Sequence, residues 1–389
     1  MPTFRGSRFI VERLLLVGSQ YDAFLLQQAG FRRFGQSWEK GPPGPEFVLA
    51  RTAAEALNTL HNVTFDLILA DQDLPDSTGL ELGRQIKQHA PKMPVVVLTS
   101  KLDYGRSRVL VPEREGVDYL FIWYGNTALL RAIVHLVEDE ASFERHVVER
   151  EGSALLLVED DASFASHYLP PLYEILRTHA LELARSADPD DEPSLDEWQD
   201  STNRPLLLYR ESYEAACECF ERCGSRLIGV ISDLEFPRAG ALDPRAGLLL
   251  TRYVKERIPS VPVIIQSHDR TLADEVHAGI AAFLWKGSDR LLGDLHELLD
   301  AYFGFGDFVF RDAAGHEIAR GHDITSLAAC VRAVPWEVFR YHGSRSHFSA
   351  WLSVHGEFEL AREARRLSVS DPTAQRRFLE LLERRLARG

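Results

Sequence analysis

The chain has 389 residues, with 44 basic and 58 acidic side chains and a formal net charge of −14 at pH 7. This length allows two or three domains that each bury a core of their own. The sequence has no apolar run long enough to cross a bilayer and no charged-then-apolar secretory start. Both observations argue against membrane-spanning and exported classes, so we expect a cytoplasmic protein without a membrane partner.

The charge pattern also argues against nucleic acid as a partner. Residues 1–302 carry a net charge of −16, which would repel a phosphate backbone. Residues 303–389 hold 13 arginines and 11 acidic side chains, so this part is only mildly basic. The sequence has no helix-turn-helix signature and no interleaved basic and aromatic patch, and we therefore expect no DNA-binding output.

The first part of the chain predicts strands that alternate with helices. Buried strands are predicted by four apolar runs: LLLV (14–17), DLILAD (66–71), VVVLT (95–99) and DYLFI (118–122). Between Asn126 and Arg150 apolar residues recur at helical spacing. This spacing favours one continuous helix that links two domains over a helix that stops near Glu140.

Residues 154–287 contain four further apolar runs, and each ends at a polar or charged side chain. The runs are LLLVEDD (155–161), LIGVISD (227–233), VPVIIQS (261–267) and AAFLWKG (281–287). Their polar ends are Glu159 with Asp160, Asp233, Ser267 and Lys286. Because ligands collect at the carboxyl ends of parallel strands in a doubly wound sheet, we expect these side chains to form one site.

These residue types suit the transfer of a phosphoryl group to a carboxylate. Asp233 is the candidate nucleophile, which would take the group as an acyl phosphate. Glu159 and Asp160 are candidate ligands of Mg²⁺, which typically takes one or two carboxylates and keeps several waters. Lys286 would pair with the transferred phosphoryl oxygens, and the hydroxyl of Ser267 would donate to another of them.

This ordered set resembles the receiver domain of bacterial two-component response regulators. The resemblance implies a flavodoxin-like α/β fold, dependence on Mg²⁺, and phosphorylation by a histidine kinase or a histidine phosphotransfer protein. It implies that Asp233 and the backbone carbonyl of Glu235 complete the metal site. It also implies that Ser267 and Phe283 form the switch that responds to phosphorylation.

Three departures from the family pattern weigh against fast phosphorylation. His268 stands where a small residue usually admits the donor, and Gly287 replaces the usual proline after the lysine. The segment FPRAGALDPRAG (236–247) lengthens the loop after the acceptor. If His268 obstructs donors, the chain would be a scaffold whose site binds Mg²⁺ without turnover.

The same pattern occurs earlier in the chain as a degenerate internal repeat. The counterparts are Gly18 and Ser19 for the acidic pair, Asp71 for the acceptor, Thr99 for the switch hydroxyl and Ile122 for the lysine. Without the two carboxylates and the ammonium, no Mg²⁺ site forms and the phosphoryl charge is not neutralised. We therefore expect a pseudo-receiver, in which Asp71 is not phosphorylated by the standard route.

Two local features each allow a structural and a functional interpretation. Residues 181–205 are acidic and contain prolines, which indicates a solvated loop, with a docking surface for a basic partner as the alternative. Cys217, Cys219 and Cys223 fall in a predicted helix. Packing as small apolar residues is favoured there over a thiolate metal site, because no second pair of ligands follows.

Residues 303–389 predict a short hairpin followed by helices. The hairpin is expected within 307–320, and the helices within 324–334, 335–355, 358–367 and 372–388. The region is similar to a segment that adjoins receiver domains in some bacterial signalling proteins, which implies an interaction module. For His342, His347 and His355, packing is favoured over a metal site, because their spacing does not place them on one helix face. Packing is also favoured over a phosphotransfer role, because only a few short helices are available for the four-helix bundle that such a histidine needs.

We therefore predict an α/β chain with two flavodoxin-like (βα)5 receiver domains in tandem and a small, mostly helical C-terminal module. The expected ranges are 8–150, 151–302 and 303–389. The predicted function is that of a response regulator phosphorylated on Asp233, without enzymatic activity beyond accepting and losing the phosphoryl group. It would signal through a protein partner or through homodimerisation. The alternative is a phosphorylation-independent scaffold or adaptor.

Overall fold

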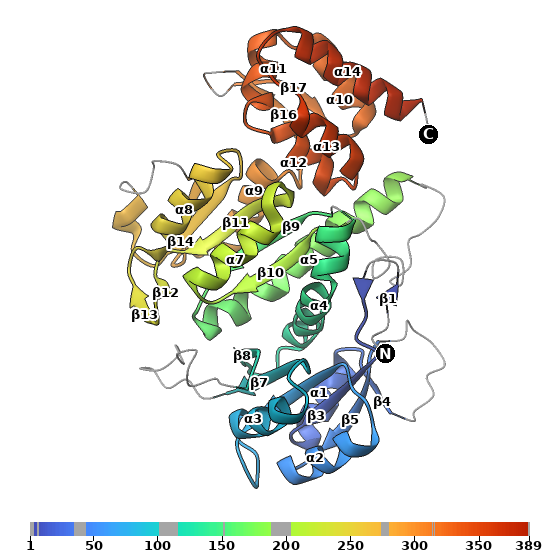
Figure 1. Ribbon diagram of the computed structural model, residues 1–389, viewed down its shortest axis with the longest axis vertical. Coiled ribbons are helices and arrows are strands. Elements are labelled where there is room, and N and C mark those ends of the chain that lie inside the picture. Colours follow the sequence, from blue (N-terminus) through green and yellow to red (C-terminus); the bar gives the residue numbers. More distant parts are fainter. Residues whose placement is uncertain are drawn as a thin grey trace. The chain divides into compact units, whose positions relative to one another are not determined.

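The computed structural model describes residues 4–5, 8–34, 44–100, 116–150, 152–187, 204–273, 280–312, 314 and 316–387. They contain two parallel β-sheets and a C-terminal group of helices (Figure 1). The described residues fall into two compact units, and each is considered by itself. The first draws on the ranges 1–145 and 159–178, and the second on 146–158, 179–188 and 203–389.

The first sheet is parallel and has the strand order β4-β5-β3-β6-β7-β8. Its strands are β3 (Arg13–Val17), β4 (Arg32–Arg33), β5 (Glu46–Ala50), β6 (Leu67–Asp71), β7 (Val95–Thr99) and β8 (Tyr119–Ile122). The five longer strands, numbered in chain order, lie as 2-1-3-4-5, which is the flavodoxin-like arrangement. The four runs predicted in this part of the chain are all strands of this sheet.

Among the described residues, three helices lie between strands of this sheet and a fourth follows β8. They are α1 (Gln20–Gln28), α2 (Ala53–Asn62), α3 (Gly79–His89) and α4 (Thr127–Phe143). Helix α1 lies beside α4, and α2 lies beside α3. The side-chain oxygens of Ser19, Thr52 and Thr78 accept hydrogen bonds from first-turn N–H groups, and these caps start α1, α2 and α3.

The predicted long helix after Asn126 is observed as two segments. Helix α4 ends at Phe143, and the chain continues as a π-helix, η2 (Glu144–Glu149). Buried polar groups of α4 hold the N-terminal hairpin of β1 (Phe4–Arg5) and β2 (Arg8–Phe9) and the residues after it. The contacts are Arg8 with Asp139 at 3.0 Å, Phe9 N–H with Ser142 Oγ at 2.8 Å and Val11 N–H with Glu138 Oε1 at 3.1 Å.

The second sheet is also parallel, with the order β10-β9-β11-β14-β15. Its strands are β9 (Ala154–Val158), β10 (Leu206–Arg210), β11 (Leu227–Asp233), β14 (Val263–Ser267) and β15 (Ala282–Trp285). In chain order they again lie as 2-1-3-4-5. Every residue of β9, β11 and β14 is buried, which explains why these strands are continuous apolar runs.

The helices of this second α/β region are α5 (Ala162–Ala187), α7 (Tyr213–Cys223), α8 (Ala246–Arg257) and α9 (Leu291–Phe303). Gly229 lies at a register shift of β11, where an added Cβ would be 2.5 Å from the Phe303 ring of α9. A side chain at this position would therefore displace α9 from the sheet.

Helix α5 is longer than the sequence indicated. It extends to Ala187, so the first part of the predicted acidic loop at 181–205 is helical, and residues 188–203 lie outside the described residues. Pro170 and Pro171 lie inside the helix, where each lacks the N–H of an intrahelical hydrogen bond. Apolar residues continue at helical spacing beyond these prolines, and this pattern explains why the start of the predicted loop is helical.

The first half of α5 packs on the edge strand β8 of the first unit. Ala162 is buried in a cluster with Val97, Leu120 and Ile122. The backbone N–H of Ile122 donates to Ser166 Oγ at 2.9 Å, and both residues are buried. This hydrogen bond satisfies an edge-strand N–H that would otherwise be buried without an acceptor.

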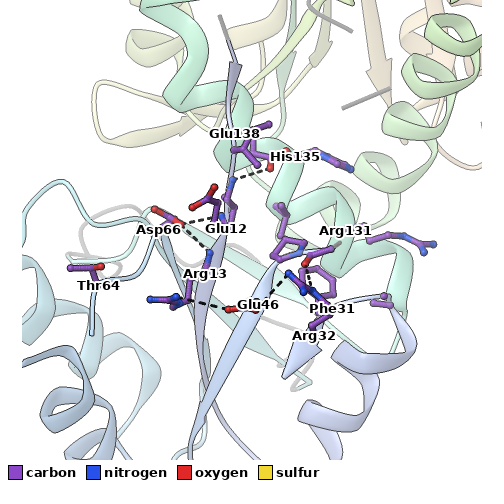
Figure 2. A pocket seen from close by; sticks show the side chains of 17 residues that line it. Glu12, Arg13, Phe31, Arg32, Glu46, Thr64, Asp66, Arg131, His135 and Glu138 are labelled. Atoms are coloured by element: carbon purple, nitrogen blue, oxygen red, sulfur yellow. Dashed lines mark hydrogen bonds and ion pairs between the residues drawn. The ribbon is translucent and has the colours of Figure 1, made fainter. Parts of the chain in front are cut away.

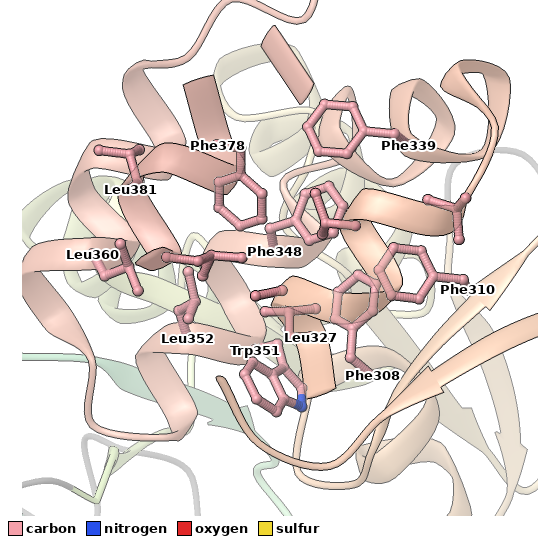
Figure 3. Packing of buried hydrophobic residues seen from close by; sticks show 14 of the residues in the cluster. Phe308, Phe310, Leu327, Phe339, Phe348, Trp351, Leu352, Leu360, Phe378 and Leu381 are labelled. Carbon is pink, nitrogen blue, oxygen red and sulfur yellow. The ribbon is translucent and has the colours of Figure 1, made fainter. Parts of the chain in front are cut away.

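The C-terminal residues form the predicted hairpin and a helical layer around one aromatic core. The hairpin is β16 (Phe308–Arg311) with β17 (Glu317–Gly321). The helices are α10 (Ile324–Ala333), α11 (Trp336–Gly343), α12 (His347–Val354), α13 (Phe358–Arg366) and α14 (Thr373–Leu386). Phe308, Phe348 and Trp351 belong to this core (Figure 3).

The prediction of a single helix over 335–355 is wrong. The chain turns between α11 and α12, and Ser346 there has a φ of 57°. The turn places Phe339 and Phe348 against each other, with ring centroids 5.0 Å apart. Stacking of the two short helices on one core therefore outweighs the helical continuity of the sequence pattern.

We predict that Ser166→Ala lowers the free energy of unfolding of the chain by about 1–3 kcal/mol, because the Ile122 N–H then lies buried without an acceptor. Ser163→Ala on the same helix is the control, since the Ser163 side chain makes no hydrogen bond among those the structure records. Urea unfolding of both variants measures the difference. Equal stability of the two variants would contradict this role of Ser166.

Buried histidines make the C-terminal helices sensitive to acid. Burial lowers the pKa of His342 to about 3 and that of His355 to about 3. The unfolded chain takes up these protons near pH 6.5, whereas the folded chain does not. The free energy of unfolding should therefore fall as the pH drops below about 6.5.

The variant His342→Gln should reduce this dependence on pH, while its side-chain oxygen can still accept the Arg311 N–H that His342 Nε2 accepts at 2.9 Å. Urea midpoints measured on either side of that pH give the slope for the wild type and the variant. An unchanged slope in the variant would show that His342 is not among the groups that titrate.

Candidate functional site

Three buried carboxylates meet at the carboxyl edge of the second sheet. Strands β9 and β11 pair up to Val158 and Ser232, so Glu159 and Asp233 are the next residues on neighbouring strands. Ligand oxygens of Glu159, Asp160 and Asp233 lie within 4.8 Å of one another. These residues are only 0%, 5% and 4% exposed, respectively. The structure thus brings together the predicted acidic pair and the predicted acceptor.

Lys286 is the cation of this cluster. Its Nζ lies 3.0 Å from Asp233 Oδ2, and both side chains are buried. The other oxygen, Asp233 Oδ1, accepts a hydrogen bond from Leu234 N–H at 2.7 Å. The ammonium and the backbone donor fix the orientation of the carboxylate.

Ser267 lies on β14, the strand next to that of Asp233, and Phe283 lies on β15, one strand further along the sheet. Strand β11 pairs Asp233 with Gln266, the residue before Ser267. Ser267 is buried, its carbonyl accepts the Lys286 N–H at 2.9 Å, and its Oγ accepts the Asp269 N–H at 3.1 Å. Phe283 is half-buried on β15 and pairs with Ile265.

Trp285 accounts for one of the departures from the family pattern. A Cβ on Gly287 would lie 2.6 Å from the Trp285 ring, so a proline at this position would collide with it. The indole Nε1–H of Trp285 donates to the His268 carbonyl at 3.0 Å and ties the ends of β14 and β15 together. His268 itself is exposed. Gly287 therefore leaves room for the Trp285 ring beside the lysine.

The long segment after the acceptor is an ordered hairpin, β12 (Phe236–Arg238) with β13 (Ala241–Asp243). Its two turn residues, Ala239 and Gly240, have φ values of 52° and 79°, as a tight hairpin turn of this type requires. Ala239 N–H donates to Glu214 Oε1 of α7 at 2.9 Å, and Phe236 is fully buried. The insertion therefore packs on α7 as a defined element.

The donor set of the cluster fits a divalent cation. Three carboxylates face one ammonium, and buried negative charge is costly unless a cation neutralises it. Hard oxygen ligands are those that Mg²⁺ prefers. The backbone carbonyl of Glu235 stays a prediction as a further ligand.

The corresponding edge of the first sheet has a different composition. A pocket of about 280 Å³ lies there and is lined by Asp71, Thr99 and Trp123, among others. Gly18 and Ser19 follow β3, and Ser19 is used to cap α1 by reciprocal hydrogen bonds with Asp22. Within the described ranges, no three ligand groups gather around Asp71 as they do around Asp233.

The surroundings of Asp71 disfavour the ionised form of its carboxyl group. Burial raises the pKa of Asp71, and the nearby carboxylates of Asp22 and Asp73 raise it further. A raised pKa makes this carboxyl group harder to ionise than that of an exposed aspartate. Asp73 N–H donates to Asp71 Oδ1 at 3.0 Å.

One assignment in the first repeat needs correction. Thr99 pairs with Ile122 as Ser267 pairs with Trp285, so the counterpart of Lys286 is Trp123 and not Ile122. The Trp123 N–H donates to the Thr99 carbonyl at 2.9 Å, as the Lys286 N–H does to Ser267. The apolar run continues through Trp123, so no polar residue marked the end of the strand. The lysine is still absent.

The remaining candidate ligands do not form metal sites in the described part of the chain. Cys219 and Cys223 are buried in α7, and none of the three α7 cysteines appears in a cluster of potential ligands. His342 and His347 face each other with Nδ1 atoms 3.0 Å apart, a pair that the sequence spacing did not indicate. Their setting is the aromatic core, as the packing interpretation expects.

Comparisons with known proteins concern mainly the first repeat. Residues 42–121 match the response regulator receiver domain family. Over 67 residues the chain is 37% identical to the DNA-binding transcriptional regulator NtrC of Escherichia coli (strain K12), which covers 17% of this chain and 14% of NtrC. Over 51 residues it is 43% identical to response regulator protein PilR of Pseudomonas aeruginosa, which covers 13% of this chain and 12% of PilR.

Solved structures of response regulators are similar to parts of the chain. The phosphorylated cyanobacterial phytochrome response regulator RcpA has 23% identity and a TM-score of 0.25, over 34% of this chain and 93% of that one. The Mn²⁺-bound form of response regulator Rcp1 has 24% identity and a TM-score of 0.25, over 35% and 96%.

The family match includes the acceptor position Asp71 and the hydroxyl position Thr99. It does not extend to the positions of the acidic pair, Gly18 and Ser19, or to that of the lysine, Trp123. The matched range covers three of the long strands of the first parallel sheet completely, namely β5, β6 and β7. Residues 42–121 of this chain are thus a response regulator receiver domain.

Proposed function

We propose that the second α/β region, residues 152–303, is a further receiver domain, and that the chain is a response regulator that accepts a phosphoryl group on Asp233. The observation that carries this proposal is the buried cluster of Glu159, Asp160 and Asp233 with Lys286 3.0 Å from the acceptor. The same strand order as in the first sheet supports it.

The chemistry follows from the positions of these groups. A bound Mg²⁺ would neutralise the carboxylates and the incoming phosphoryl oxygens. Asp233 would attack the phosphorus of a donor, form a bond from its carboxylate oxygen to phosphorus, and release the donor's leaving group. Lys286 would then exchange its ion pair with Asp233 for one with the phosphoryl group. Ser267 lies at the end of the next strand, where its hydroxyl can donate to a phosphoryl oxygen.

The first receiver domain is, in this proposal, a pseudo-receiver. Glycine, serine and tryptophan occupy the positions of its acidic pair and lysine, and the pKa of Asp71 is raised by burial. Its role would be to contact other segments or partners. In the first unit the edge of β8 already binds α5, through Ser166 and Ala162.

The partners follow from the same proposal. A histidine kinase or a histidine phosphotransfer protein would supply the phosphoryl group in the cytoplasm, and the output would be a change in protein–protein contact or dimerisation. NtrC is named a DNA-binding regulator, but the chain spans only 14% of it, and net negative charge over residues 1–302 disfavours DNA. Among the described residues no helix is both long and apolar enough to cross a membrane.

A scaffold that binds Mg²⁺ without phosphorylation is the second candidate. The acceptor Asp233 is only 4% exposed. The hairpin β12–β13 follows the acceptor, and His268 follows Ser267, where the family has a small residue. These features favour slow phosphorylation, phosphorylation by a specialised donor only, or no phosphorylation.

Phosphorylation should require Asp233 and not Asp71. After incubation with Mg²⁺ and acetyl phosphate, we expect the wild type and Asp71→Asn to gain the mass of one phosphoryl group, and Asp233→Asn to gain none. Intact-protein mass spectrometry measures this directly. Phosphorylation that persists in Asp233→Asn and disappears in Asp71→Asn would reverse the assignment of the two repeats.

Metal binding should depend on Asp160 and not on its neighbour Asp161. Asp160 belongs to the carboxylate cluster, whereas Asp161 accepts the Ser163 N–H at 2.8 Å at the start of α5. Asp160→Asn should weaken Mg²⁺ binding by at least roughly tenfold, and Asp161→Asn should leave it nearly unchanged. Calorimetric titration with MgCl2 tests both variants, and equal affinities for Mg²⁺ would remove Asp160 from the metal site.

A further inference from the structure

A second pocket lies in the first unit, at the opposite end of its sheet from Asp71. It has a volume of about 400 Å³ and is lined by residues at the amino-terminal ends of β3, β4 and β5 and by one face of α4 (Figure 2). This volume is within the range of small-ligand sites. None of the residues that line this pocket belongs to the set that the receiver chemistry uses.

Two arginines in this pocket share one carboxylate at long range. Arg13 and Arg32 approach the Glu46 carboxylate at 3.9 and 3.6 Å, which is longer than a hydrogen bond. Figure 2 shows Glu46 between them. Arg13 Nε is buried and has no hydrogen-bond partner among the described residues. Neither guanidinium group therefore makes the pair of short hydrogen bonds to one carboxylate or phosphate that arginine prefers.

Both guanidinium groups are nevertheless held in place. The Arg13 guanidinium lies over the Phe34 ring, 4.9 Å from its centroid. Arg32 Nε donates to the Gly44 carbonyl at 3.2 Å. Such preorganised guanidinium groups lose little entropy when they bind an oxyanion.

Two of the other acidic groups of the pocket, Asp66 and Glu138, accept hydrogen bonds from backbone donors, and the third, Glu12, is exposed. Asp66 Oδ2 accepts the N–H groups of Glu12 and Arg13, both at 3.0 Å. Glu138 Oε1 accepts the Val11 N–H at 3.1 Å, and its Oε2 lies 3.0 Å from His135 Nδ1. Glu46 is thus the carboxylate that directly faces the arginines.

A third arginine lines the pocket from α4. Arg131 is exposed. Its charge lowers the pKa of the nearby Glu174, but the Glu174 carboxylate accepts its hydrogen bond from Arg177 Nε, at 3.0 Å. Apolar atoms of Val11, Phe31 and Val134 complete the lining. The lining thus holds three guanidinium groups and four carboxylates, and two of these carboxylates are engaged by backbone N–H groups. An organic anion that displaces Glu46 would meet the guanidinium groups and the apolar wall.

We propose that this pocket binds a small organic anion, whose phosphate or carboxylate group replaces Glu46 as the partner of Arg13 and Arg32, with Arg131 as a third cation. The first receiver domain would then respond to a ligand. Binding of the anion would affect helix α4, because this helix carries Arg131 and also holds the N-terminal hairpin through Asp139. The proposal does not depend on phosphorylation of Asp233.

The test is calorimetric titration of the full chain in Mg²⁺-free buffer with ribose 5-phosphate, inorganic phosphate, succinate and, as a neutral control, ribose. Arg32→Gln removes a pocket guanidinium. Arg33→Gln is the matched control, since the adjacent arginine on β4 does not line the pocket. Glu46→Gln removes the competing carboxylate while keeping the shape of the side chain.

We expect the wild type to bind at least one of the anionic probes and not ribose. Arg32→Gln should weaken that binding by roughly tenfold or more, Arg33→Gln should leave it unchanged, and Glu46→Gln should tighten it severalfold. Preference for ribose 5-phosphate over succinate would identify a phosphate ligand, and the reverse a carboxylate ligand.

The proposal would be overturned if no anionic probe bound the wild type, if Arg32→Gln bound like the wild type, or if Glu46→Gln lost affinity while its urea midpoint was unchanged. The last result would mean that Glu46 orders the arginines and does not compete with a ligand.

Discussion

The arrangement of the second sheet depends on the compensation of buried charge at its carboxyl edge. Glu159, Asp160 and Asp233 are nearly or fully buried, and the ammonium of Lys286 pairs with Asp233. Fully buried strands and their pairing hold these groups together against their mutual repulsion. Such a site favours a divalent cation, which would offset the negative charge of the carboxylates and of an incoming phosphoryl group.

The first sheet lacks, at the equivalent positions of its carboxyl edge, the acidic pair and the lysine that the second sheet has. Its strand order is the same, but Ser19 caps a helix and Trp123 takes the position of the lysine. The pocket around Asp71 therefore has a carboxyl group with a raised pKa and no cation partner from the lysine position. Another group of charged side chains lies at the other end of the sheet, around Arg13, Arg32 and Glu46.

Much of the fold and the acidic site could be predicted from the sequence, because most of the apolar runs end where their strands end. Asp71 and Asp233 occupy equivalent ends of β6 and β11 for this reason. The lysine position of the first repeat was misplaced by one residue, since the run at β8 continues into Trp123. The hydrogen bond between Ile122 and Ser166 and the arginine pocket were not predictable, because they join residues far apart in the chain without a local pattern.

The central claim, a Mg²⁺-dependent phosphate site at Asp233, is tested most directly by ¹⁹F NMR of the full chain with beryllofluoride, a mimic of the phosphoryl group. The account predicts a protein-bound fluoride signal for the wild type only when Mg²⁺ is present, and no such signal for Asp233→Asn. A bound signal that persists in Asp233→Asn, or its absence from a wild type that binds Mg²⁺, would contradict the account.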